Sequence, residues 1–286
     1  CEGLVGSEMC IRDRFISIMK KITFIFLTSI IAVSCSNSTN DIMNNSVNSD
    51  SPASNYVEYV WHSAEENFNA ENLAMLIEKW NQIIDSYSCD MDGANILTPT
   101  EKRDNYDFIW VLKWPSVDAR NSCWDTWSKD YAENWDQTIN GIMSYDPNNA
   151  FMFEVEPGRS PKKENTSGSF VNTFYFCKFN DGNDMSSLNA YRNDLAKVST
   201  FSDNHWYVLL NPTFETDPGG PDFVWLDLWG SNQDKNSDME IWQSTDLPDK
   251  AESMVACDEF SNNAVVIRYY LNGAGREDRT LIKRLE

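Results

Sequence analysis

Two segments of this chain are nearly identical: DFIWVLKWPS at residues 107–116 and DFVWLDLWGS at residues 222–231. They begin at positions 107 and 222, which is an offset of 115. At this offset the neighbouring residues also match without a gap: Phe108 with Phe223, Trp110 with Trp225, Trp114 with Trp229, Asn121 with Asn236, and Trp127 with Trp242. Upstream, LTPT at 97–100 matches LNPT at 210–213 once two extra residues are allowed in the second copy. The chain therefore contains two copies of about 100 residues, the size of a domain and not of a solenoid repeat.

The first segment alternates as a β-strand does, and both of its faces are apolar. One face carries Phe108, Trp110, Leu112 and Trp114, and the other carries Ile109 and Val111. A strand with two apolar faces must be covered on both sides. A single copy with helices on one face of its sheet would leave the other face exposed to water. Two copies in one chain can cover each other's open face.

Each copy has the same expected order of elements, βαββαβ. In copy one we expect strands at 56–64, 94–99, 106–115 and 149–157, a first helix capped by Asn69, and a second helix carrying Trp124, Trp127, Tyr131 and Trp135. In copy two we expect strands at 169–179, 205–212, 222–229 and 263–271, a first helix capped by Asp184, and a second helix over 235–257. This order is typical of the ferredoxin-like arrangement, an antiparallel sheet with both helices on one face. The sequence predicts an α+β fold in which two such units, 56–157 and 169–273, are joined by a linker at 158–168 and pack sheet against sheet.

The two ends of the chain are read separately from the fold. Residues 5–14, VGSEMCIRDR, resemble a translated sequencing adapter, so 1–18 are treated as an artefact. Residues 19–34 read as a signal peptide ending at a lipobox-like AVSC, which makes Cys35 the expected lipid attachment site; an ordinary signal peptide with a chance cysteine is the alternative. The Ser/Asn-rich stretch 35–55 is expected to be a disordered tether, and 274–286 a charged C-terminal tail.

Charge and targeting signals limit the partners and the location. The chain has 23 Lys and Arg against 44 Asp and Glu, a net charge of −21. Such a charge repels phosphate backbones and anionic lipid surfaces, so we expect no nucleic-acid partner and membrane contact only through the lipid anchor. Ser36, instead of aspartate, follows Cys35, which by analogy with enteric lipoproteins indicates the outer membrane of a Gram-negative bacterium.

The duplication, the element order and the aromatic strands resemble the dimeric α/β-barrel superfamily in a tandem-fused form, across residues 56–273. The resemblance implies that the protein is a monomer built as an internal pseudo-dimer. Members of that superfamily include cofactor-independent monooxygenases, haem-degrading enzymes and chlorite dismutase-like haem proteins. They usually hold a ligand between the sheet and its helices, so the resemblance also implies a pocket there.

Two functional hypotheses follow. The first is binding, or oxidative conversion, of a small apolar or aromatic molecule in the cell envelope. The second is a non-catalytic interaction module of the envelope. The sequence has no Gly-rich phosphate loop, no HExxH and no paired CxxC, so we expect neither a cofactor nor a metal. If the protein is an enzyme, the resemblance implies a cofactor-independent monooxygenase.

Asp227 is the leading candidate for a catalytic or anchoring residue. It lies in the aromatic stripe of its strand, where copy one has Leu112, and a buried carboxylate needs a partner or a raised pKa. We expect Asn172 to donate a hydrogen bond to it or Arg268 to pair with it, which would make it a general base or polar anchor; a structural ion pair or a solvated strand end is the alternative.

Other residues complete the candidate site. Trp225 and Trp229 would form its walls, with Trp110 and Trp114 at the matching positions of copy one; the alternative is that all four are plain core. Glu58 and His62 share one face of the first strand and make a second candidate site.

Four cysteines remain beyond Cys35, an even number in an oxidising compartment. In βαββαβ topology the end of the first helix and the start of the second lie at one end of the sheet, which puts Cys89 near Cys123. Cys177 and Cys257 also fall at a common end. We therefore expect two disulfides within the copies, Cys89–Cys123 and Cys177–Cys257, with free buried thiols as the alternative.

Overall fold

The computed structural model describes residues 55–163 and 165–269, and all statements below concern these residues. The predicted artefact, signal peptide, Cys35 and nearly all of the tether, as well as the C-terminal tail, lie outside them. Repeat one consists of β1 (Tyr56–Ala64), α2 (Ala70–Ser86), β2 (Gly93–Pro99), β3 (Phe108–Trp114), α3 (Val117–Asp130), α4 (Ala132–Ile139) and β4 (Met143–Arg159). Repeat two consists of β5 (Ser169–Phe179), α5 (Met185–Leu195), β6 (His205–Pro212), β7 (Phe223–Trp229), α6 (Asn232–Gln243), α7 (Leu247–Met254) and β8 (Val255–Tyr269). None of these helices combines the length and the apolar character that a membrane span requires.

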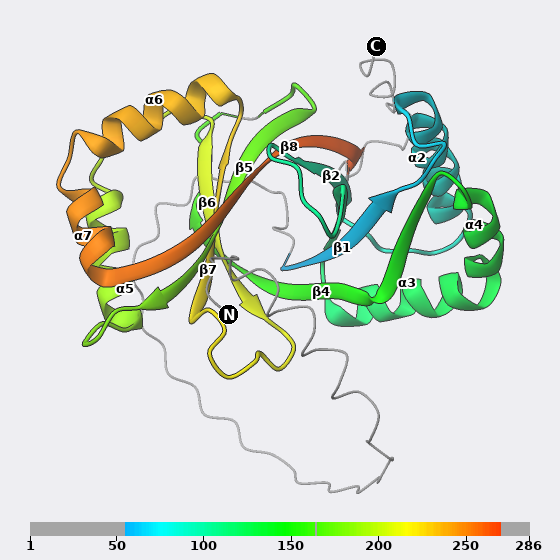
Figure 1. Cartoon of the computed structure of the whole chain (residues 1–286), viewed down its shortest axis with the longest axis horizontal. Coiled ribbons are helices and arrows are strands. Elements are labelled where there is room, and N and C mark those ends of the chain that lie inside the picture. The colour runs from blue at the N-terminus through cyan, green and yellow to red at the C-terminus, as the bar shows by residue number, and fades with distance from the viewer. Residues whose placement is uncertain (1–54, 164, 270–286) are drawn as a thin grey trace, which may run out of the picture. The chain divides into compact units, whose positions relative to one another are not determined.

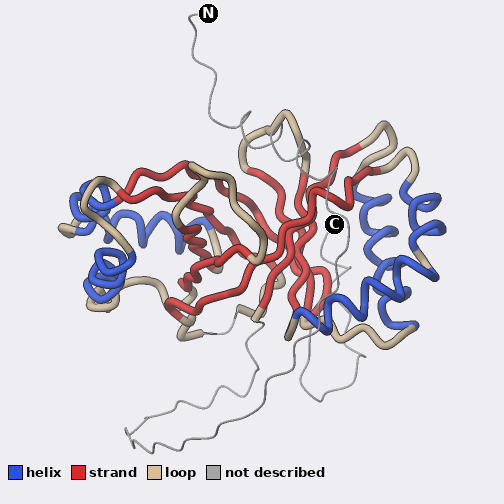
Figure 2. The backbone as a smooth tube through the Cα atoms, turned by 90° about the horizontal axis from the view of Figure 1, so that it is seen from below, coloured by secondary structure: helices blue, strands red, loops and turns tan. Residues whose placement is uncertain are grey.

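The eight strands form one closed antiparallel barrel in the order β1-β3-β2-β8-β5-β7-β6-β4. Each repeat contributes four neighbouring strands in the ferredoxin-like order, β4-β1-β3-β2 and β8-β5-β7-β6. The helices of repeat one cover one side of the barrel and those of repeat two cover the opposite side (Figure 1, Figure 2). The α+β class and the pairing of two sheets in one chain are therefore as predicted.

Strands β4 and β8 are longer than predicted, and each pairs with strands of both repeats. The added residues 143–148 and 255–262 lie mainly against β1 and β5 of their own repeats. The first part of β4 pairs with β1, and its end, from Phe153 to Arg159, pairs with β6 of repeat two. In the same way β8 pairs with β5 and then, from Asn262, with β2 of repeat one. These two strands close the barrel, so their hydrogen-bonding partners extend beyond the repeat that encodes them. β4 also runs into the segment expected to be linker.

The alternation of β3 decides what fills the two sides of the sheet. Ile109 and Val111 point into the barrel, where they join a core cluster drawn from both repeats. Trp110 and Trp114 point to the helices of repeat one, with Leu112 between them. Repeat two has its own helix-side cluster. The barrel interior is thus an apolar core shared by the repeats, which explains why both faces of this strand are hydrophobic.

The first helix of each repeat begins at the predicted cap: Asn69 accepts from Asn72 N–H, and Asp184 accepts from Ser186 and Ser187 N–H. The second helices, predicted to be continuous, are broken. In repeat one the chain leaves helical geometry at Tyr131 (φ −130°), between α3 and α4.

In repeat two α6 ends at Gln243 and a new helix starts at Leu247, with a proline in its first turn. Proline has no N–H to donate and suits a helix start, which accounts for the restart there. Cys257, expected at the end of the helix, lies in β8 instead.

The structure contains the two disulfides Cys89–Cys123 and Cys177–Cys257. Their Cα atoms are 4.7 and 4.1 Å apart, both below the separation of about 7 Å beyond which a disulfide cannot form. Each disulfide stays within one repeat, and none of the described cysteines links the two repeats. Cys89 and Cys123 are both buried, whereas Cys257 is exposed beside a buried Cys177.

This difference in exposure predicts the order of reduction. Under limiting dithiothreitol on the folded protein, Cys177–Cys257 should open before Cys89–Cys123, because a thiolate must reach a sulfur to attack it. Timed alkylation followed by peptide mass spectrometry measures the order. Faster loss of Cys89–Cys123 would contradict the exposures described above.

Candidate functional site

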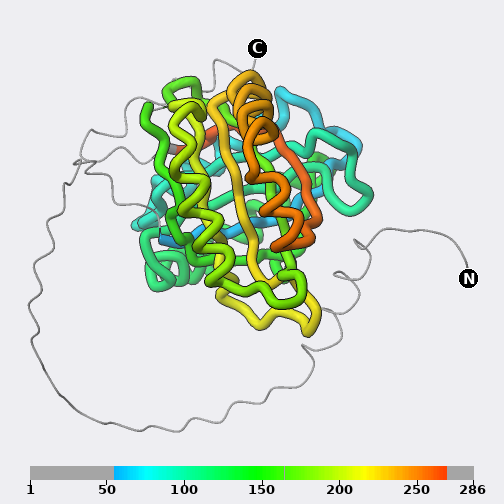
Figure 3. The backbone as a smooth tube through the Cα atoms, turned by 90° about the vertical axis from the view of Figure 1, so that its left-hand side faces the viewer, coloured from blue at the N-terminus to red at the C-terminus, as the bar shows by residue number. Residues whose placement is uncertain are grey.

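The candidate site lies on the helix side of the repeat-two sheet, below the helices seen face-on in Figure 3. Asp227 in the middle of β7 pairs with Thr173 of β5, and Thr173 pairs with Ser261 of β8. One step along the strands, Tyr175 pairs with Glu259. Lys235 reaches this row from α6. We call these six residues the polar cluster: Thr173, Tyr175, Asp227, Lys235, Glu259 and Ser261.

Asp227 is held by a histidine, not by either of its predicted partners. Its Oδ1 lies 2.9 Å from Nε2 of His205, and the Asp227 side chain keeps 18% of its exposure. The His205 ring stacks on Trp229 at 5.2 Å between centroids, and its Nδ1 lies 3.6 Å from Oδ2 of Asp238. His205 is therefore clamped between two carboxylates over an indole face.

Asp238 is the buried member of this pair of carboxylates. It accepts the indole N–H of Trp229 at 3.1 Å and the backbone N–H of Ser202 at 2.7 Å. Burial raises the pKa of its carboxyl, although the hydrogen bonds and nearby His205 oppose the shift. Asp238 fixes the position of the ring system, and Asp227 is the member that reaches the surface.

Lys235 places a half-buried ammonium in the polar cluster. Its Nζ donates to Thr173 Oγ1 at 2.8 Å and to Ser261 Oγ at 2.9 Å. It also lies 5.6 Å from the centroid of the Trp229 ring. Burial lowers the pKa of Lys235, while the charges of Glu259 and Asp227 act the other way. Among the described residues, no carboxylate oxygen lies within 4.0 Å of the Lys235 Nζ, so this ammonium forms no ion pair with them.

Repeat one has a saturated carboxylate at the corresponding place. Glu58, only 1% exposed, accepts the indole N–H groups of Trp114 at 3.2 Å and Trp124 at 2.9 Å. Arg120 donates to it through both Nε and Nη2. With two indole donors and a guanidinium on one carboxylate, Glu58 is a structural hub and offers little to a ligand.

The offset of 115 relates the two arrangements residue by residue. It places Thr173 at the position of Glu58, Asp227 at that of Leu112, and Lys235 at that of Arg120. The matching strand registers place Tyr175, Glu259 and Ser261 at the positions of Val60, Ala150 and Met152. The polar cluster therefore belongs to repeat two alone, because repeat one is apolar at four of the six positions.

The four predicted wall residues are buried. Trp110, Trp114, Trp225 and Trp229 keep 3%, 0%, 7% and 2% of their exposure. The Tyr207 ring stacks on Trp225 at 4.0 Å, and His205 covers Trp229. These indoles pack against protein groups, as the core alternative expects. Tyr175, which is partly exposed, is the aromatic ring that the polar cluster presents.

Two expected partners of Asp227 lie elsewhere. Asn172 points into the barrel, where its Oδ1 accepts from Asn262 Nδ2 at 2.9 Å, because strand alternation sends it to the opposite face from Thr173. Arg268 donates to Asn81 and pairs with Asp85 at 3.0 Å, both on α2. It reaches repeat one because β8 crosses into the β2 seam.

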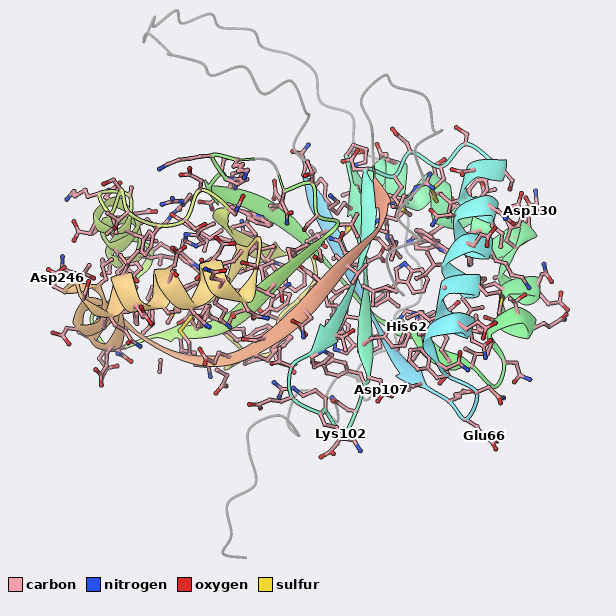
Figure 4. The ribbon with its side chains drawn as sticks, turned by 90° about the horizontal axis from the view of Figure 1, so that it is seen from above. His62, Glu66, Lys102, Asp107, Asp130 and Asp246 are labelled. Carbon is pink, nitrogen blue, oxygen red and sulfur yellow. A yellow bond between two sulfur atoms is a disulfide. The ribbon has the colours of Figure 1, made fainter. Side chains whose placement is uncertain are left out.

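His62 lies on the face of β1 that is turned to the helices of repeat one (Figure 4). Its ring stacks on Phe108 at 5.0 Å, and its Nδ1 lies 2.9 Å from the Val60 carbonyl oxygen. The strand registers and the offset of 115 both equate His62 with Cys177. Four residues separate it from Glu58 along β1, and the contacts of each are with other groups. The two do not form a joint site.

Two hollows of the structure lie away from the polar cluster. One of about 400 Å³ lies over α4, lined by Glu133, Asp136, Gln137 and Asn140. Another of about 350 Å³ lies between α2 and α4 and includes Lys79, Asn134 and Trp135 in its lining. The described part of the chain gathers no metal-binding group of three or more His, Cys, Asp or Glu side chains.

Sequence reasoning missed the most informative members of the site. His205 was noted only as the start of a strand, and Lys235, Tyr175 and Asp238 were not singled out. The repeat itself held a signal for Lys235, since extending the same offset pairs it with Arg120. No comparable signal existed for His205, whose meeting with Asp227 depends on the register of β6 against β7.

This arrangement can hold a polar small molecule and accept a proton. His205 occupies Oδ1 of Asp227, and the exposed fraction of this carboxylate can accept a hydrogen bond or a proton from outside. Lys235 supplies a cation, while Thr173 and Ser261 supply hydroxyls.

No protein-family model and no curated protein matches this sequence. Among solved structures, the fold is similar to the chlorite dismutase of Candidatus Nitrospira defluvii in complex with imidazole, at 8% identity and a TM-score of 0.48, over 74% of this chain and 91% of that one. It is also similar to an anthrone oxidase-like protein, at 12% identity and a TM-score of 0.45, over 76% and 93%. Identities and TM-scores this low give no information on the function of this chain. The assignment of the fold rests on the observed strand pairing.

His62 generates a prediction about stability against pH. Burial lowers its pKa from 6.5 to about 4, so the unfolded chain binds a proton between these values and the folded chain does not. The stability is present above pH 6.5 and is lost as the pH falls towards 4. His62→Phe should remove about 2 kcal/mol of the stability loss between about pH 7.5 and 5, measured by urea unfolding. An unchanged pH dependence in the variant would show that folding does not lower the pKa of His62.

Proposed function

We propose that this protein is a cell-envelope lipoprotein that binds a small organic molecule at the polar cluster of repeat two. The observation that carries the proposal is the contrast between the repeats. In repeat one the buried carboxylate of Glu58 has all its acceptor positions filled by donors of the chain. In repeat two the matched region brings together the carboxylate of Asp227, the ammonium of Lys235 and two hydroxyls. A scaffold role alone gives no reason for repeat two to depart from the apolar pattern of repeat one.

In this proposal Asp227 and Tyr175 are the residues that contact the ligand. Asp227 is the polar anchor, oriented by His205, and Tyr175 is the aromatic contact. Asp227 is also the group that would remove a proton if the bound molecule were oxidised without a cofactor, as the superfamily resemblance implies. His205 is a positioning residue, because its Nε2 is engaged with Asp227.

Mass spectrometry under native conditions tests the proposal. Protein released from bacterial envelopes in mild detergent should retain a small molecule, and Asp227→Leu, which installs the residue of repeat one, should lose it. Asp181→Leu in an exposed turn of the same repeat is the matched control and should retain it. Empty wild-type protein, or equal retention by Asp227→Leu, would refute the proposal.

The second candidate is a non-catalytic interaction module. It is favoured by the packing of Trp225 and Trp229 against protein rings and by hollows that lie over α2 and α4 of repeat one. Empty protein in the experiment above would favour this candidate.

The envelope location is part of the proposal. The lipobox-like sequence before Cys35 supports a lipid anchor, and two disulfides are typical of proteins outside the cytoplasm. Ser36 after Cys35 supports the outer membrane.

Metabolic labelling with an alkyne fatty acid measures the anchor directly. Wild-type protein expressed in a Gram-negative host should carry the label, and Cys35→Ala should not. Full labelling of Cys35→Ala would exclude Cys35 as the attachment site.

A further inference from the structure

Lys235 and Thr173 occupy the two positions that form an ion pair in repeat one, but only Lys235 is charged. In repeat one the same two positions hold Arg120 and Glu58, which form a charge-assisted pair. Repeat two keeps the cation and replaces the acid with a threonine hydroxyl. A half-buried ammonium is costly unless an anion faces it, because burial disfavours its charged form.

The contacts of the Lys235 ammonium satisfy part of its hydrogen-bonding capacity. Two of its three hydrogens are directed to Thr173 and Ser261, and the Trp229 ring lies to one side. Glu259 and Asp227 act on it only at longer range, and Asp227 is already engaged with His205. The third hydrogen of the Lys235 ammonium therefore has no acceptor among the described residues, and an anion from outside the chain could accept it.

We propose that the ligand of repeat two carries a carboxylate that binds Lys235, at the place where repeat one supplies Glu58. This inference rests on the proposed function and names the chemical class of its ligand. The carboxylate accepts from Nζ and from the hydroxyl of Ser261, because the buried Thr173 can donate its own hydrogen to Ser261 Oγ at 2.8 Å.

The neighbouring acids narrow the class further. Asp227 and the exposed Glu259 flank Lys235 along the same sheet face, and a simple anion would be repelled by both. A ligand with an ammonium beside its carboxylate satisfies all three charges at once. The site therefore fits a zwitterion, the chemistry of an α-amino acid, with Tyr175 as the contact for its side chain.

Three probes of one shape separate the charge classes by isothermal titration: L-phenylalanine, 3-phenylpropionate and L-phenylalaninamide. The wild type should bind the zwitterion most tightly, the anion less tightly and the cation least. Lys235→Met should weaken phenylalanine binding about ten- to hundredfold, the loss of one charged hydrogen bond, and Lys235→Arg should restore most of it. Lys197→Met, at a side chain that is 75% exposed, is the control and should change nothing.

Thr173→Glu is the sharpest variant, because it supplies the missing carboxylate from within the chain. It should abolish phenylalanine binding and raise the melting temperature, as an internal competitor would. If the larger side chain prevents folding at this buried position, the Lys235 variants decide the matter alone. Tightest binding of the amide, no phenylalanine binding to the wild type, or no effect of Lys235→Met would each overturn the inference. A retained neutral molecule in the native mass spectrum would overturn it too, while leaving the proposed function intact.

Discussion

The structure depends on one constraint: the central strands of both repeats are apolar on both faces. Ile109 and Val111 cannot remain in water, and the helices of repeat one lie on the other side of their sheet. The chain meets the constraint by closing two four-stranded sheets into one barrel around a shared core. The long strands β4 and β8, the two seams between the repeats and the position of Arg268 far from Asp227 all follow from that closure.

Against this common framework the two repeats treat buried charge differently. Both use a carboxylate to hold the indole N–H of an equivalent tryptophan, Glu58 for Trp114 and Asp238 for Trp229. The acid comes from a strand in repeat one and from a helix in repeat two, at the position that Cys123 occupies in repeat one. The first strand of repeat two therefore holds no acid at this place, and Thr173 and Asp227 contact Lys235 and His205 instead.

Much of the fold was readable from the sequence, because alternation and helix capping are local. The faces of β3 and the caps Asn69 and Asp184 depend on residues within a few positions of each other. The lengths of β4 and β8 were not readable, because the added residues 143–148 and 255–262 join the sheet by pairing with β1 and β5, which are distant in the sequence. The site was less predictable still: Asp227 was found by its oddity in an aromatic stripe, but His205 joins it only through the register of two strands, and Asn172 was assigned to the wrong face.

Closure within one chain has an evolutionary meaning. In a barrel built from two identical chains, every substitution appears twice, so a polar residue that suits a ligand in one half also weakens the packing of the other half. Fusion removes this obligation. Leu112 can fill the core of one half while Asp227 stands at the matching position of the other. The tryptophan strands β3 and β7 are thus the features that the two repeats share, and the polar cluster is a feature that a fused chain can place in one repeat alone.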